Sequence, residues 1–179
     1  MELQENLHID ESTDQSQNRY LTFLTDGQLF ALPIREIVQI TQMQEIIPLP
    51  EQTHYVKGMI NLRGQIIPVI DMRLRFGKQE AEFTERTCII IVHIQDSDFG
   101  FIVDEVDEVL DIEAEQISPP PKVSTEFSNA NNYLTGVARL SNTEGKNERV
   151  ALLLNAGKIL GENEFTALSE AVEASENEE

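Results

Sequence analysis

The chain has 179 residues, of which 40% are apolar, and it carries 32 acidic against 13 basic residues for a net charge of −19. This apolar content is enough for a folded core in one domain or two small fused ones, and it excludes a wholly disordered chain. Phosphate binding needs a basic face, and the sequence contains no basic cluster. We therefore expect no nucleic-acid partner and no binding to anionic membrane surfaces.

The acidic charge is concentrated at the two ends of the chain. Residues 1–18 hold five acids and residues 162–179 hold seven, with no Lys or Arg in either segment. We expect flexible, solvated acidic tails here: a disordered one over 1–18, and one over 162–179. In the second tail, Phe165, Leu168 and Val172 have the spacing of a short docking helix.

Targeting signals are missing from the sequence. No apolar run approaches the roughly 20 residues that cross a bilayer, and the N-terminal segment lacks the features of a signal peptide. Cys88 is the only cysteine, which excludes an intramolecular disulfide. We therefore expect a cytoplasmic protein with no direct membrane insertion.

The first predicted element is a β-hairpin. Apolar runs at 20–24 and 29–32 flank Asp26-Gly27, a pair typical of tight hairpin turns. A segment beginning at Ile34 has helical spacing for one turn before the chain becomes extended.

Residues 56–77 predict a second hairpin followed by a short helix. Two apolar runs, 58–60 and 66–70, are joined by Asn61-Leu62-Arg63-Gly64, a polar link closed by glycine. Pro68 removes one donor from the ladder, which predicts that its strand lies at a sheet edge or a bulge. Asp71 is suited to cap the helix that follows.

Arg63 lies at the predicted turn tip of this hairpin. One interpretation is a solvated turn residue with no specific role. The other is a guanidinium held out on a rigid hairpin to meet a carboxylate of a partner.

The second half of the chain repeats the order of the first. Residues 31–40 align with 100–109, and Asp71 corresponds to Asn155, which is also suited to cap a short helix. The repeat predicts two small all-β units, about 19–82 and 83–161, and leaves open whether they exchange a strand. The second unit has no Asn-Leu-Arg-Gly turn, which favours a functional role for Arg63.

The densest acidic group is the run 104–111. Carboxylates this close in sequence are compatible with a hard-cation site or an acid/base pair, and so with a metal-dependent enzyme. No zinc-type Cys/His grouping, phosphate loop or catalytic triad spacing accompanies them. We predict instead that the acids are the solvated face of a strand, and that the apolar residues of the same segment form a buried stripe of Val103, Val106, Val109 and Leu110.

The framework around the central hairpin resembles a known family. The order Gly58, Asn61-Leu62-Arg63-Gly64, Ile67-Pro68-Val69-Ile70-Asp71 and a short helix ending in Phe76-Gly77 is similar to that of CheW, the family of bacterial chemotaxis coupling proteins. The resemblance covers roughly residues 19–160. It implies an all-β fold of two packed five-stranded SH3-like β-barrels related by internal duplication, with short helices. It also implies a non-catalytic adaptor that needs no metal and no cofactor.

The resemblance further implies the partners. Proteins similar to this one couple transmembrane chemoreceptors to the histidine kinase CheA by binding its C-terminal regulatory domain and the cytoplasmic tip of the receptor. The chain would then be a monomer alone and part of a receptor array when assembled. The alternatives are a CheW-like paralogue in another array, controlling pili or gliding, and the metal-dependent enzyme.

Eight residues fall where the family places its receptor- and kinase-contacting elements. Many relatives carry an acid at position 39, where this chain has glutamine, so a charge-dependent contact is in doubt there. Two of the eight, equivalent in the two halves, either line an apolar groove between the barrels or pack in the core: Ile37 and Val106. The expected partner-binding residues are Ile37, Gln39, Gly58, Asn61, Arg63, Gly64, Gly100 and Val106.

Overall fold

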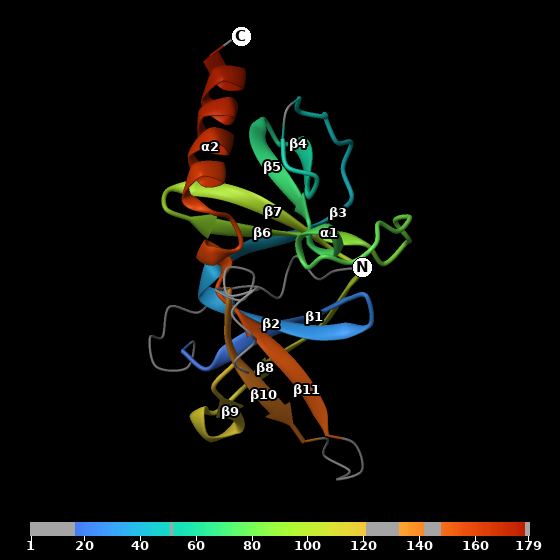
Figure 1. Ribbon diagram of the computed structural model, residues 1–179, viewed down its shortest axis with the longest axis vertical. Coiled ribbons are helices and arrows are strands. Elements are labelled where there is room, and N and C mark those ends of the chain that lie inside the picture. Colours follow the sequence, from blue (N-terminus) through green and yellow to red (C-terminus); the bar gives the residue numbers. More distant parts are fainter. Residues whose placement is uncertain (1–16, 51, 121–132, 142–147, 178–179) are drawn as a thin grey trace.

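The structure is a computed structural model that describes residues 17–50, 52–120, 133–141 and 148–177. The disorder expected over residues 1–18 therefore falls almost wholly outside the described residues. The described chain folds into two β-sheets, one above the other in Figure 1. The strands are β1 (Arg19–Thr25), β2 (Gln28–Pro33), β3 (Ile37–Gln42), β4 (Val56–Leu62), β5 (Gln65–Asp71), β6 (Cys88–Ile94), β7 (Ser97–Val103), β8 (Glu105–Asp111), β9 (Ile117–Ser118), β10 (Leu134–Leu140) and β11 (Arg149–Leu154).

The helices are short except for the last one. In the described part of the chain, the 3-10 helices η1 (Ile34–Glu36), η2 (Ala114–Gln116) and η4 (Ala156–Lys158) accompany α1 (Met72–Arg75) and α2 (Glu162–Asn177). None of the described helices has both the length and the apolarity of a membrane span. The all-β fold class is confirmed.

Each sheet takes strands from both halves of the sequence. The five-stranded sheet has the order β3-β6-β7-β5-β4, and the six-stranded sheet has the order β8-β1-β2-β11-β10-β9. Two parallel contacts join the halves, β5 with β7 and β2 with β11. The halves thus exchange strands, which the sequence left open, and the repeat boundary near residue 82 stays a prediction.

Both predicted hairpin turns have two residues. Thr25 pairs with Gln28 across the first turn, and Leu62 pairs with Gln65 across the second. In the second turn both central residues, Arg63 and Gly64, have positive φ angles of 54° and 88°, as tight hairpin turns require.

The expectation for Pro68 was wrong. Its strand β5 lies inside the sheet, between β7 and β4, and the bulge in the β4–β5 pairing falls between Val56 and Gly58. The proline is tolerated because the parallel ladder between β5 and β7 begins only at Val69, so Pro68 lies just outside it.

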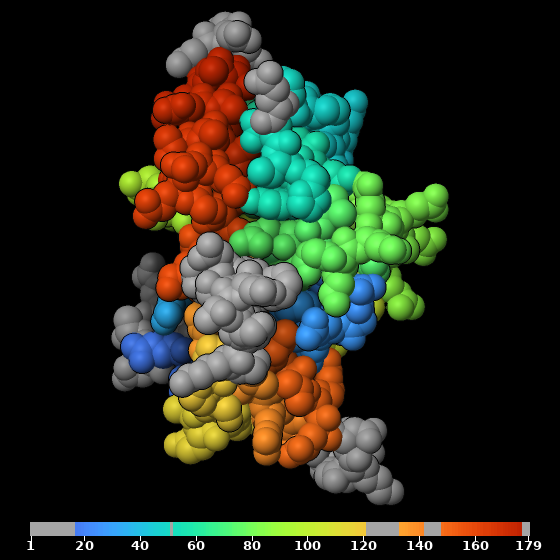
Figure 2. All heavy atoms as spheres, in the orientation of Figure 1, coloured from blue at the N-terminus to red at the C-terminus, as the bar shows by residue number. Residues whose placement is uncertain are grey.

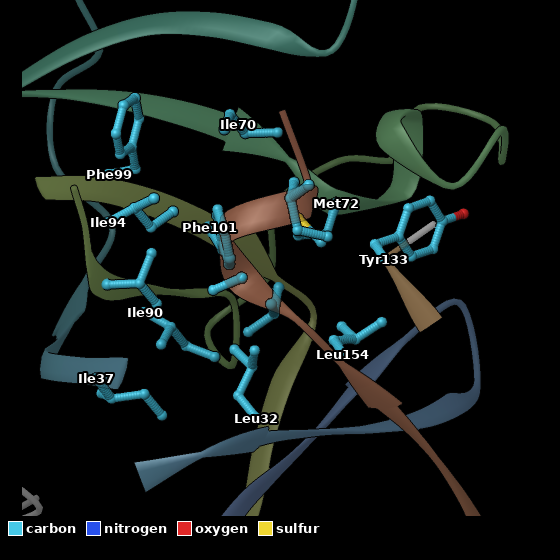
Figure 3. Close-up of a cluster of buried hydrophobic side chains, with 14 of the residues drawn as sticks. Leu32, Ile37, Ile70, Met72, Ile90, Ile94, Phe99, Phe101, Tyr133 and Leu154 are labelled. Carbon is cyan, nitrogen blue, oxygen red and sulfur yellow. The ribbon is translucent and has the colours of Figure 1, made fainter. Parts of the chain in front are cut away.

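The short helix α1 packs between the two sheets. As predicted, Asp71 caps it, accepting hydrogen bonds from the backbone N–H groups of Arg73 (2.9 Å) and Leu74 (3.4 Å). Met72, the first residue of α1, is fully buried in a core that includes Leu32 and Leu154 of the six-stranded sheet and Phe101 of the five-stranded sheet (Figure 3). One hydrophobic cluster therefore fixes how the two sheets pack on each other.

The acidic C-terminal segment is the 16-residue helix α2 rather than a flexible tail. It packs along the hairpin of β4 and β5, where Figures 1 and 2 show it in red. Leu168 is fully buried, and the Phe165 ring lies 5.2 Å from that of Phe99. Phe165 and Leu168, two of the three residues whose spacing predicted a helix, anchor it to the core.

Candidate partner-binding groove

A groove of about 780 Å³ lies between the tip of the central hairpin and the start of β8. Its walls come from both sheets, because β3, β4 and β6 belong to the five-stranded sheet and β8 belongs to the six-stranded one. Polar groups and apolar side chains share its lining. The apolar side chains are Ile40, Leu62 and Val106, and the charged ones are Arg63, Glu85, Arg86 and Glu105.

Three of the eight expected binding residues meet in this groove: Asn61, Arg63 and Val106. Gly64 completes the same turn. The Asn61 side chain accepts a hydrogen bond from the Gly64 N–H at 2.9 Å, which fixes the turn beneath the arginine. Asn61 and Gly64 thus hold Arg63 in place.

The Arg63 side chain is exposed at the rim of the groove. Its neighbour Arg86 pairs with Glu105 at 3.7 Å. In the part of the chain that the structure describes, no acidic side chain forms such a pair with Arg63. A cation presented without a partner, above apolar side chains, suits recognition of a carboxylate on another protein.

Val106 is half-buried, with one side against the main core and the other toward the groove. Ile40 and Leu62 are similarly half-buried. A half-buried apolar side chain adds buried area when a partner covers it. These three side chains therefore offer apolar contact area within a groove that also has charged and polar lining residues.

The other four expected residues lie elsewhere in the structure. Ile37 points into the core and is 4% exposed, among the buried side chains in Figure 3. Gln39 is half-buried on β3, and Gly58 and Gly100 are buried in β4 and β7. The structure gives Ile37, Gly58 and Gly100 a packing role, and a partner contact at any of the four stays a prediction.

The apolar residues within and beside the acidic run do not form the predicted buried stripe. Residues 105–111 form β8, an edge strand, and Val109 is 44% exposed whereas Val103 is buried. Alternation along an edge strand sends successive side chains to opposite faces.

Two carboxylates of the acidic run form ion pairs, since Arg149 lies 2.7 Å from Asp107 and 3.6 Å from Glu108. No group of three or more potential ligands positioned for a metal ion occurs among the described residues.

Sequence reasoning missed Ile40, Arg86 and Cys88 as groove residues. Each lies outside the hairpin motif: Ile40 and Cys88 reach the groove on the paired strands β3 and β6, and Arg86 lies just before β6. Leu62 was within the recognised motif but was treated as part of a turn. Leu62 is the last residue of β4, directly before the turn, and this position in the motif could have identified it as a groove residue.

Cys88 provides a chemical probe inside the groove. Burial raises the pKa of its thiol from 9.0 to about 11, so about 100-fold less thiolate is present at neutral pH. The greater nucleophilicity of a more basic thiolate offsets part of this. We expect maleimide labelling about tenfold slower than in the denatured chain, with a rate that still rises above pH 9.5. A rate that levels off near pH 9 would contradict the burial.

Comparison with known proteins places the chain in a family. Residues 19–164 match the family model described as the CheW-like domain. The chain belongs to the CheW family. It is 30% identical over 146 residues to chemotaxis protein CheW of Klebsiella aerogenes, covering 82% of this chain and 83% of that protein. It is 32% identical to CheW of Thermotoga maritima, covering 79% and 87%.

A solved structure shows the same fold. The crystal structure of the scaffolding protein TtCheW from Thermoanaerobacter tengcongensis matches with a TM-score of 0.69 and 31% identity, covering 82% of this chain and 94% of that chain. Members of the CheW family are non-catalytic scaffolds. The chain is therefore a scaffold and not an enzyme, and the acidic run needs no catalytic explanation.

Proposed function

We propose that this CheW-family scaffold couples transmembrane chemoreceptors to the histidine kinase CheA through protein contacts alone. The observation that supports this proposal is the groove: half-buried apolar side chains beside a guanidinium that is carried on an ordered turn and has no ion-pair partner among the described residues. A surface of this kind suits a helix that lays its apolar face into a groove and presents a carboxylate at one edge. The receptor tip, a helical hairpin, and the C-terminal regulatory domain of CheA are the expected partners.

The rigidity of the hairpin favours binding through Arg63. The two-residue turn and the Asn61–Gly64 hydrogen bond leave little backbone freedom at the tip. Less entropy is then lost when a partner docks, because the backbone that carries the cation is already ordered. Arginine is among the residue types that dominate the binding energy of many interfaces when a partner covers them.

The test is a calorimetric titration of Arg63→Ala against the C-terminal regulatory domain of CheA and, separately, against a receptor tip fragment from the same organism. We expect the free energy of unfolding to change by less than about 0.5 kcal/mol. Association with the partner that uses the groove should weaken by about 2 kcal/mol or more if Arg63 is an anchor.

Arg139→Ala is the matched control, because Arg139 is also an exposed arginine on a hairpin strand but lies outside the groove, on β10. The control should bind both partners like the unmodified protein. If the Arg63 variant binds each partner with the affinity of the unmodified protein, Arg63 is not part of either interface. No binding by the folded, unmodified protein would direct the search to the kinase of another array.

A further inference from the structure

Among the described residues, Arg73 forms an ion pair with Asp104 through two hydrogen bonds. Its Nε lies 2.8 Å and its Nη2 2.6 Å from the two carboxylate oxygens of Asp104, and its Nη1 lies 3.1 Å from Asp26. The Asp104 hydrogen bond is the largest of the causes that raise the pKa of Arg73. A two-bond fork of this kind fixes orientation as well as distance.

Asp104 holds three segments together. It occupies the junction between β7 and β8, and its N–H donates to the Leu24 carbonyl at 3.0 Å. Its carboxylate accepts from the Asp26 N–H at 2.8 Å. Arg73 therefore connects α1 both to the turn between β1 and β2 and to the first residues of β8.

One side of this connection runs directly into the groove, and the other leads to it through the central hairpin. Glu105 and Val106 follow Asp104 directly and line one wall. On the other side, α1 follows β5, the second strand of the hairpin that carries Arg63. The path from Arg63 along β5 to Arg73, across to Asp104 and into Val106 thus runs from one wall to the other.

We propose that Arg73 is a positioning residue that sets the separation of the groove walls through its fork to Asp104. The groove is built from two sheets, so its width depends on where β8 lies relative to the hairpin. The hydrophobic core fixes the sheets as bodies, but β8 is an edge strand whose first residues are only half-buried. The ladder to β1 holds β8 within the six-stranded sheet, and the fork adds the restraint that ties its first residues to α1. The link to partner binding rests on the proposed function, whereas the geometric claim stands by itself.

The test uses Cys88 as a reporter that requires no partner. This thiol lines the groove next to Val106, so a shift of β8 uncovers it. Arg73→Lys keeps the charge but loses the fork, and we expect its maleimide labelling rate at pH 8.5 to rise about threefold or more through local opening. Labelling is measured well below the unfolding midpoint of each variant.

Arg75→Lys is the matched control on the same helix. Arg75 points away from Asp104, with its guanidinium 5.3 Å from the Tyr55 ring and 4.8 Å from the Tyr133 ring. This variant should label like the unmodified protein. If both variants label equally faster, the effect is general destabilisation and the proposal fails; it also fails if Arg73→Lys labels at the unmodified rate.

A second variant approaches the fork from its other end. Asp104→Asn keeps the shape of the side chain but removes its charge, and it should label like Arg73→Lys, with the double variant no faster than either single one. Additive rates in the double variant would overturn the proposal. If Arg73→Lys fails to fold, the Asp104→Asn rate relative to the Arg75→Lys rate decides the question.

Affinity separates this inference from the proposed function. For the partner that requires Arg63, Arg73→Lys should weaken binding about tenfold while Arg75→Lys leaves it unchanged. Faster labelling with no partner bound by the unmodified protein would leave the positioning role standing and refute the proposed function. Binding that is indifferent to Arg73, together with unchanged labelling, would refute the positioning role and leave the proposed function standing.

Discussion

Replacing Gly58 by Ala is expected to lower the free energy of unfolding by about 3 kcal/mol or more. A Cβ at this position would lie 2.1 Å from the backbone oxygen of Ile47. Backbone cannot move aside as a flexible side chain can. The Ile47 segment would have to shift, and its two hydrogen bonds to Met59, of 2.7 and 2.8 Å, are each worth about 1 kcal/mol. The φ angle of +145° at Gly58 adds strain for any residue with a side chain.

Gly64→Ala is the control that isolates the close approach. Gly64 also has a positive φ, +88°, but nothing lies within 4 Å of its added Cβ, so its loss should be limited to about 1–2 kcal/mol of backbone strain. Urea titration of both variants measures the difference. Equal losses at the two positions would mean that the Ile47 segment moves away freely, and the contact would then not restrain the hairpin.

The structural role of Gly58 affects how a loss of partner binding in a Gly58 variant is interpreted. A loss of partner binding in a Gly58 variant has a simple cause if the hairpin that carries Arg63 is displaced or unfolded. Binding must therefore be compared per folded molecule. A contact role for Gly58 would require weaker binding in a sample shown to be fully folded.

Local chemistry made much of the fold predictable from the sequence. Asp26-Gly27 and Arg63-Gly64 specify turns whose backbone favours glycine, and Asp71 caps α1 with its own carboxylate. These signals depend on residues within a few positions of one another. The helical spacing in the C-terminal segment was likewise local and led to α2.

What the sequence could not give depends on contacts between distant segments. Pro68 reads as an edge residue because its own strand does not reveal where the neighbouring ladder begins. Val109 has the character of a core residue, but its strand is an edge of the six-stranded sheet. Ile37 and Val106 are equivalent in the two halves, yet Ile37 is buried and Val106 is half-buried and faces the groove.

The groove itself illustrates the same limit. Arg63 and Asn61 were recognised from the motif, whereas Ile40 and Cys88 reach the groove through the pairing of β3 with β6. A family motif marks the residues of one segment, and the surface that a partner meets is assembled from several.

Gly100→Ala is expected to lower the free energy of unfolding by about 2–3 kcal/mol through overpacking. Gly100 lies within β7, between β6 and β5, where an added Cβ would sit 2.7 Å from Cγ2 of Ile89 and 2.8 Å from Cγ1 of Val69. Both neighbours are fully buried, and the clashing methyl groups are attached directly to Cβ, so neither can swing away by a rotation at its end.

A second substitution tests this cause. Val69→Ala removes one of the two clashing methyl groups, so the Gly100→Ala/Val69→Ala double variant should lose less stability than the two single variants together. Additive losses in urea titration would show that overpacking is not the reason.

Where the Gly100 variant is fully folded, it should bind the partners with unchanged affinity, because position 100 is buried within the sheet. Reduced affinity in that sample would instead mean that sheet packing is transmitted to the groove, and Gly100 would then act on binding through β7 and the Asp104 junction that follows it.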